Sequence, residues 1–215
     1  MDLSRHIKTK WIKPPVFTLC LAPLAQLTWK ALHNGLGANP VEAITHSTGT
    51  WTLVFLCVTL SMTPLRRLLH QNWLVRFRRM FGLFAFFYGC LHLTTYVWLD
   101  KSLDFSEMIQ DVYKRPFITA GFTAFLLMVP LAVTSTSGMI RRLGGKRWQM
   151  LHRLVYVSAI TGAIHYYWLV KSDETVPLRF AAVVGTLLVY RLLVNFCGRM
   201  NPTRVTASVV RYLNQ

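Results

Sequence analysis

The sequence is poor in charged residues, and above all in acidic ones. Only 15% of its 215 residues are charged, and it holds 8 Asp and Glu against 24 Lys and Arg. A soluble domain carries about 25% charged residues, whereas 53% of the residues here are hydrophobic. This balance argues against a water-soluble globular domain and favours a membrane protein.

The sequence also lacks the motifs of several other protein classes. It has no zinc-finger, phosphate-loop or dinucleotide motif and no Cys-x-x-Cys pair. Its four cysteines lie in or beside apolar segments, where small buried side chains are expected rather than metal or disulfide chemistry: Cys20, Cys57, Cys90 and Cys197. A net charge of +16 would suit nucleic acid. The bases, however, form short clusters beside apolar segments, so we expect contacts with membrane lipid and none with nucleic acid.

Long apolar segments are what the sequence does have. About 20 apolar residues cross a bilayer core about 30 Å thick. The segments predict an all-α membrane protein, a bundle of six transmembrane helices that forms a single domain over residues 1–215. The spans lie near residues 15–33, 47–64, 80–99, 117–135, 151–170 and 178–197. Arg191 interrupts the last span near one end, where its side chain can extend to the headgroups.

The charges orient this bundle. Alternate connections hold 16 of the 24 bases, whereas the opposite connections hold four bases and seven of the eight acids. The positive-inside rule therefore places both termini in the cytoplasm, in agreement with an even number of spans. The 16 bases are Arg5, Lys8, Lys10, Lys13, Arg66, Arg67, Arg76, Arg78, Arg79, Arg141, Arg142, Lys146, Arg147, Arg199, Arg204 and Arg211.

Three histidines lie in the predicted spans: His92, His152 and His165. An ionisable residue inside a membrane is a functional candidate by default, and neutral imidazole is a common ligand of haem iron. His92 lies roughly 18 Å and His165 roughly 21 Å along their spans from the cytoplasmic side. This similar depth predicts that the two face each other and ligate one haem. Two axial imidazoles suit electron transfer better than oxygen activation. The alternative role is a hydrogen bond between helices.

His152 lies about 20 Å from His165 along the same span, so the two cannot bind one iron. It is level with Arg78 and Arg79 and close to the basic 141–147 segment. Arginine binds propionate or phosphate through two oxygens at once. This group therefore predicts either a second haem or an anionic cofactor, with a purely structural role for His152 as the alternative. A single outer haem would leave most of the bilayer uncrossed, which favours a second redox group here.

Several segments resemble one protein family. They are residues 37–40 with His46, 63–66, 78–82, 91–96, 134–136, 143–152 and 164–166. The pattern Lys-Arg-Trp-Gln-x-Leu-His at 146–152, followed by His-Tyr at 165–166, is the most specific of them. Together they resemble the MsrQ family, the haem-binding membrane subunit of the bacterial protein-methionine-sulfoxide reductase system. That family belongs to the ferric-reductase-like transmembrane group.

The resemblance implies a multi-pass protein of the bacterial inner membrane that carries haem b and FMN. It implies haem ligation by His92, His152 and His165. It also implies a periplasmic molybdenum-cofactor subunit as partner, which reduces methionine sulfoxide and so repairs oxidised proteins. The electron donor stays open between a cytoplasmic flavin reductase and quinol. Because the sequence holds no soluble domain large enough to fold separately, a nucleotide-binding reductase would be another polypeptide.

Two other functions stay open at this stage. A transmembrane ferric reductase or another b-type cytochrome would use the same histidines, but it needs a reduction site at the outer face. A small transporter would need broken helices or polar residues along a path, and no acidic residue lies inside a predicted span. The acidic connection at 100–116 is either a docking surface for a partner or simply solvated.

Overall fold

The computed structural model describes residues 3–170 and 173–200, and every regular element in those ranges is a helix. The prediction of an all-α protein is thereby confirmed. Side chains are described from Trp11 onward, except at position 195 and beyond Phe196. The predictions that involve Arg5, Lys8, Lys10, Lys171, Cys197, Arg199, Arg204 and Arg211 fall outside the described residues or side chains.

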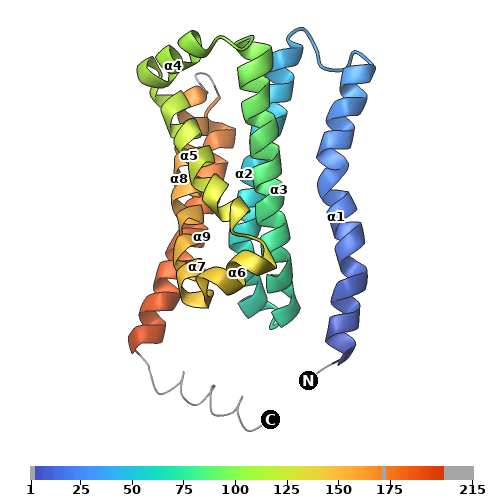
Figure 1. Cartoon of the computed structure of the whole chain (residues 1–215), viewed down its shortest axis with the longest axis vertical. Coiled ribbons are helices and arrows are strands. Elements are labelled where there is room, and N and C mark those ends of the chain that lie inside the picture. Colours follow the sequence, from blue (N-terminus) through green and yellow to red (C-terminus); the bar gives the residue numbers. More distant parts are fainter. Residues whose placement is uncertain (1–2, 171–172, 201–215) are drawn as a thin grey trace.

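In the described part of the chain, six long helices form the bundle, with shorter helices between them (Figure 1). Among the described residues, four segments are long and apolar enough to cross a membrane: Pro40–Leu68, Asn72–Asp100, Pro116–Val133 and Thr175–Val194. The chain is thus a multi-pass membrane protein. For α1 and α8 the predicted spans stay predictions; α8 has 16 residues, a length of about 24 Å. The long helices are α1 (Leu3–Leu32), α2 (Pro40–Leu68), α3 (Val75–Thr94), α5 (Pro116–Val133), α8 (Leu154–Leu169) and α9 (Thr175–Met200).

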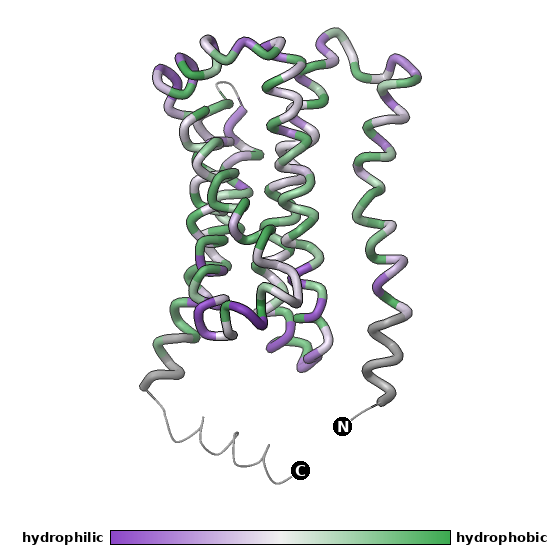
Figure 2. The backbone as a smooth tube through the Cα atoms, in the orientation of Figure 1, coloured by the Kyte–Doolittle hydropathy of each residue, from purple (hydrophilic) through white to green (hydrophobic). Residues whose placement is uncertain are grey.

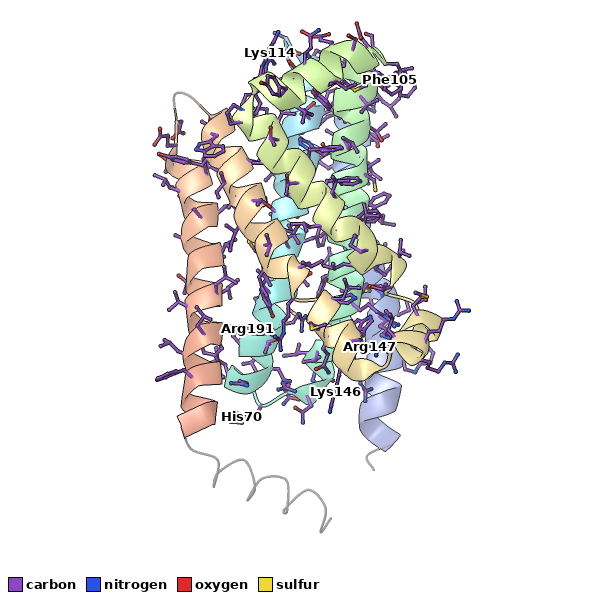
Figure 3. The ribbon with its side chains drawn as sticks, turned by 60° about the vertical axis from the view of Figure 1, so that its left-hand side comes forward. His70, Phe105, Lys114, Lys146, Arg147 and Arg191 are labelled. Carbon is purple, nitrogen blue, oxygen red and sulfur yellow. The ribbon has the colours of Figure 1, made fainter. Side chains whose placement is uncertain are left out.

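The helices pack largely as neighbouring pairs. Helix α2 packs along α3, α5 packs along α8, and α9 lies against α8 and α2, while α1 stands to one side (Figure 1). Apolar residues fill the middle of the bundle and hydrophilic residues gather at its two ends (Figure 2). We call the end that holds Lys146 and Arg147 the basic end (Figure 3). The opposite end, where Phe105 and Lys114 lie, is called the acidic end because the described Asp and Glu residues are there (Figure 3). Helix α1 begins and α9 ends at the basic end (Figure 1).

Local signals explain where several helices begin. The Asn39 side chain accepts a hydrogen bond from the Glu42 backbone N–H at 3.3 Å, and Pro40 occupies the first helical position of α2. Pro116 does the same for α5. Such caps satisfy donors that a helix start leaves unpaired, and proline there loses no hydrogen bond.

Tyr88 attaches α1 to the rest of the bundle. Its hydroxyl donates to the Cys20 carbonyl at 2.9 Å and accepts from the Leu24 backbone N–H at 3.2 Å. In a regular helix Leu24 would donate to Cys20 directly, but Pro23 lies inside this turn and disturbs it. Tyr88 is almost fully buried and stacks on Phe55 with ring centres 5.3 Å apart. One hydroxyl therefore bonds to two backbone groups of the turn that holds Pro23 and links α1 to α3.

Short helices occupy connections that the sequence pattern left irregular. At the basic end, α6 (Ser137–Leu143) and α7 (Gly145–Leu151) meet at Gly144, whose φ of 74° is a conformation that glycine adopts without strain. The basic 141–147 segment is thus two helix ends around one corner. Thr136 caps α6 by accepting from the Met139 N–H at 3.2 Å.

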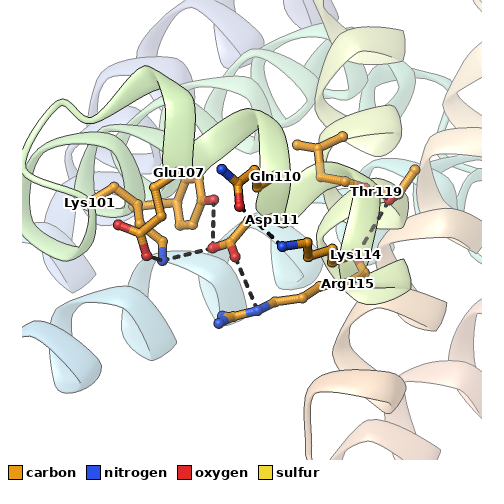
Figure 4. A network of polar contacts seen from close by, with 9 residues as sticks. Lys101, Glu107, Gln110, Asp111, Lys114, Arg115 and Thr119 are labelled. Carbon is orange, nitrogen blue, oxygen red and sulfur yellow. Dashed lines mark hydrogen bonds and ion pairs between the residues drawn. The ribbon is translucent and has the colours of Figure 1, made fainter.

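The connection at the acidic end folds into α4 (Phe105–Lys114), which turns its polar face inward. Buried Asp111 accepts from Lys101 Nζ at 2.7 Å, Arg115 Nε at 3.1 Å and the Tyr96 hydroxyl at 3.3 Å (Figure 4). Lys101 also pairs with Glu107 (Figure 4). Two of the four acids proposed for docking thus hold α4 to the bundle, while its apolar side chains Phe105, Ile109 and Tyr113 are exposed.

A paired-histidine centre as candidate functional site

His92 and His165 lie together near the acidic end of the bundle. His92 is on α3, two residues before that helix ends at Thr94. The chain then continues as a π-helical turn, η2 (Thr95–Asp100). His165 is on α8. Their ring centres are 6.0 Å apart and the ring planes are inclined at 73°. The depth argument from sequence placed these two histidines side by side, and the structure does bring them together.

Each of the two rings is fixed by a backbone carbonyl. His92 Nδ1 lies 3.0 Å from the carbonyl oxygen of Thr45 on α2, and His165 Nδ1 lies 2.6 Å from that of Phe117 on α5. Because a carbonyl only accepts, each Nδ1 carries the proton and donates it. The lone pair is then left on Nε2 of both rings, the arrangement that a metal-binding histidine adopts.

Two glycines let the rings lie where they do. A Cβ at Gly49 of α2 would lie 3.0 Å from His92 Cε1, and one at Gly121 of α5 would lie 2.7 Å from His165 Nδ1. The second contact is closer than real side chains show, so any other residue would displace the ring. The sequence analysis missed both glycines, because a glycine within an apolar span gives no sign of its neighbour on another helix.

This geometry fits a haem. Metal–imidazole bonds are about 2 Å long, so two imidazoles on opposite sides of one iron place their ring centres roughly 6 Å apart. Among the described residues, no three His, Cys, Asp or Glu side chains gather to hold a metal ion by themselves. A haem needs few protein ligands, and His92 and His165 are the candidates to hold one.

His152 lies at the basic end in a turn between α7 and α8, not inside a spanning helix as the sequence suggested. Its ring stacks on Trp148 with centres 3.9 Å apart, and its Nε2 lies 3.2 Å from the Thr134 hydroxyl. Thr134 donates its own proton to the Pro130 carbonyl at 2.6 Å, so His152 Nε2 is the donor and the ring lone pair is on Nδ1. Trp148 also donates to the Thr134 carbonyl at 2.9 Å, so the stacked Trp148 and His152 rings are both held against the end of α5.

The two arginines proposed beside His152 differ in placement. Arg78 is half-buried and close enough to His152 and Arg191 to interact with both electrostatically. Arg79 is exposed, because consecutive helical residues point about 100° apart. Of the two arginines, only Arg78 joins this group.

His46 at the acidic end lies 3.9 Å from the exposed carboxylate of Glu42.

Known proteins share this chain's sequence over most of its length. The family model described as ferric reductase like transmembrane component matches residues 48–163, which carry His92 and His152. The protein-methionine-sulfoxide reductase heme-binding subunit MsrQ of Herminiimonas arsenicoxydans is 57% identical over 183 residues, with 84% of each chain covered. The proteins of the same name from Ralstonia nicotianae and Azospira oryzae are 52% and 50% identical, over 84% and 93% of this chain and 84% and 87% of theirs.

The ferric-reductase-like match covers α3 and α5 entirely and most of α8. The chain therefore belongs to the MsrQ family, within the ferric-reductase-like transmembrane proteins.

Proposed function

We propose that the chain is the haem-binding, electron-transferring subunit of a protein-methionine-sulfoxide reductase system of the bacterial inner membrane. The observation that carries this proposal is the His92–His165 pair, with both Nδ1 protons held by carbonyls and ring centres 6.0 Å apart. The names of its relatives describe the same role. Haem b, when bound, supplies reversible one-electron chemistry at its iron.

The residues of this chain would orient and insulate that group. The Thr45 and Phe117 carbonyls fix the tautomer and the ring orientation of each ligand, which raises ligand basicity. Gly49 and Gly121 admit the rings between the helices. His92 and His165 would both hold the iron of this group, which would then supply electron transfer, and the chemistry on methionine sulfoxide would belong to a partner.

We further propose that six spans cross the membrane with both termini cytoplasmic, and that electrons leave at the acidic end, in the periplasm. The acceptor is a periplasmic catalytic subunit with a molybdenum cofactor, which repairs oxidised proteins. The donor is a cytoplasmic flavin reductase or quinol. His165 lies about 16 Å along α8 from Leu154, and His152 lies before that start, so a second redox group, a haem or FMN, beside His152 and Arg78 would shorten the electron path.

The visible spectrum of the purified protein tests the haem ligands. His92→Ala and His165→Ala should each abolish or shift the reduced haem bands in folded protein. His33→Ala is the matched control, because His33 is exposed at the end of α1, where it stacks on Trp29. Unchanged bands in both variants would remove the assignment.

A transmembrane ferric reductase is the second candidate, and the family match over residues 48–163 favours it. The two functions differ in their acceptor. Reduced protein in membranes should be oxidised by the molybdenum-cofactor subunit and not by ferric citrate. Rapid oxidation by ferric citrate alone would favour the reductase.

A further inference from the structure

A small cavity opens at the basic end between α2, α8 and α9, away from the histidine centre. It has a volume of about 60 Å³ and is lined by Arg67, Tyr156 and Arg191 among others. One water needs about 10–15 Å³ on this measure. The cavity, which we call the arginine cavity, therefore admits a compact polar group but not a large ring system.

The charge around the arginine cavity is strongly positive and uncompensated. Arg67 and Arg191 line it, and Arg78 and Arg153 lie within electrostatic range of Arg191. The seven described acids are all at the acidic end, on the far side of the bundle from Arg191 (Figure 3). Four guanidinium groups thus share this region with no described carboxylate. Since such charge is costly at the edge of a membrane, an anionic ligand would stabilise it.

Tyr156 provides the second, independent observation. Its hydroxyl is buried, and among the described residues it has no hydrogen-bond partner. The Arg191 guanidinium carbon lies 4.7 Å from the centre of the same ring, a cation–π contact that fixes the two side chains together. A buried hydroxyl without a partner costs free energy, so its position on the cavity wall points to a ligand oxygen.

We propose that the arginine cavity binds a phosphate group. The planar arginine fork bonds two phosphate oxygens at once, and the Tyr156 hydroxyl can donate to a third. The remaining wall is largely apolar, with Leu60, Leu187 and Leu188. The group attached to the phosphate would lie along this apolar surface. Two sources share this chemistry: the headgroup of an acidic phospholipid, and a soluble phosphate or phosphate ester. The site does not depend on the proposed electron-transfer function.

Binding to the full-length protein separates the two sources. Native mass spectrometry of protein extracted from membranes shows whether one acidic phospholipid is retained. Titration of delipidated protein with FMN and with inorganic phosphate shows whether a soluble phosphate binds. Arg191→Gln should weaken whichever ligand binds about 10- to 100-fold, because a charge-assisted contact is lost. Tyr156→Phe keeps the ring and its contact with Arg191, and should weaken binding about 2- to 10-fold.

Arg141→Gln is the matched control, because Arg141 is an exposed arginine of α6 at the same end. It removes the same charge and should bind as the wild type does. Elution on size exclusion reports folding without reference to haem. Loss of phosphate binding can therefore be told apart from loss of haem at the His92–His165 pair. If Arg191→Gln does not fold, Tyr156→Phe alone decides. Wild-type-like binding by Tyr156→Phe and Arg191→Gln, or no binding of lipid, FMN or phosphate by the wild type, would overturn the proposal.

Discussion

At the residue scale, Gly49 and Gly121 matter because they have no side chain. Each lies on a helix that faces an imidazole of the histidine centre, and a methyl group on either would meet the ring at 3.0 Å or less. The ring nitrogen could then move off its carbonyl, Thr45 for His92 and Phe117 for His165. The absence of a side chain at Gly49 and Gly121 thus helps to hold each histidine ring in position, as its hydrogen bond to a carbonyl does.

Gly121→Ala should therefore lower haem affinity without unfolding the protein. Displacing a group that orients a metal ligand costs about 10- to 100-fold in affinity, and alanine favours the helix itself. The haem-to-protein ratio and the reduced spectrum measure this effect. Gly185→Ala is the control, since nothing lies within 4 Å of a Cβ at that helical position. Equal haem retention in the two variants would contradict the role given to Gly121.

Tyr88→Phe should destabilise the protein by about 1–2 kcal/mol. The change keeps the buried ring but leaves the Leu24 N–H and the Cys20 carbonyl without the hydroxyl that bridges them. Thermal unfolding in detergent, followed by circular dichroism, gives the shift. Tyr113→Phe is the comparison, because Tyr113 is 90% exposed. A melting temperature equal to that of Tyr113→Phe would mean that α1 is held elsewhere.

At the scale of elements, ion pairs attach helix α4 to the rest of the bundle. Hydrogen bonding from Lys101 lowers the pKa of Asp111, and hydrogen bonds to Asp111 and Glu107 raise the pKa of Lys101. An acid with a lowered pKa stabilises the fold above its unfolded value of about 4 and loses that effect as the pH falls through the folded value. A lysine with a raised pKa stabilises it below about 10 and loses that effect at higher pH. The attachment is therefore complete between about pH 4 and pH 10.

Asp111→Asn should loosen α4 by about 1.5–3 kcal/mol, the range for hydrogen bonds to a charged group. Amide hydrogen exchange over residues 105–114 at pH 7 measures the lost protection. The difference from wild type should begin to shrink below about pH 4 and disappear once the pH falls through the lowered pKa of Asp111 in the folded protein, where its carboxyl group is protonated. Asp100→Asn, an exposed acid one residue before Lys101, should leave exchange unchanged. Similar exchange in both variants would show that the network does not hold α4.

At the scale of the whole molecule, the proposed topology follows from the 16 bases on alternate connections against four on the others. A phosphatase that works only in the periplasm should be inactive when fused after Gln215 and active when inserted into the 101–104 turn. Activity of the fusion after Gln215 would reverse the orientation. It would also place the arginine cavity at the outer face.

Electron entry at the basic end gives a second prediction at this scale. His152→Ala and Arg78→Lys should slow reduction of the outer haem by the cytoplasmic donor by about tenfold or more, while the haem bound by His92 and His165 is retained. Lysine keeps the charge of Arg78 but cannot form its two-pronged hydrogen bond. Arg79→Lys, on the exposed side of the same turn, serves as control. Wild-type reduction rates in both test variants would exclude a second redox group here.

The sequence by itself determined the helical, membrane-spanning character and the candidate ligands. Apolar length and charge placement report the bilayer directly, because the bilayer imposes the same requirement on each span wherever that span packs. The depth of His92 and His165 could be counted along their helices for the same reason, since the rise per residue is constant.

Only the tertiary structure decided which surfaces meet. The contacts of His92 with Thr45 and Gly49, and of His165 with Phe117 and Gly121, join residues more than 40 positions apart. Their rotation about each helix axis depends on packing with neighbours. The same holds for Arg78 against Arg79, for the turn at His152, and for the cavity beside Tyr156 and Arg191. Periodicity within one helix carries no information on these contacts, because their free energy arises between helices.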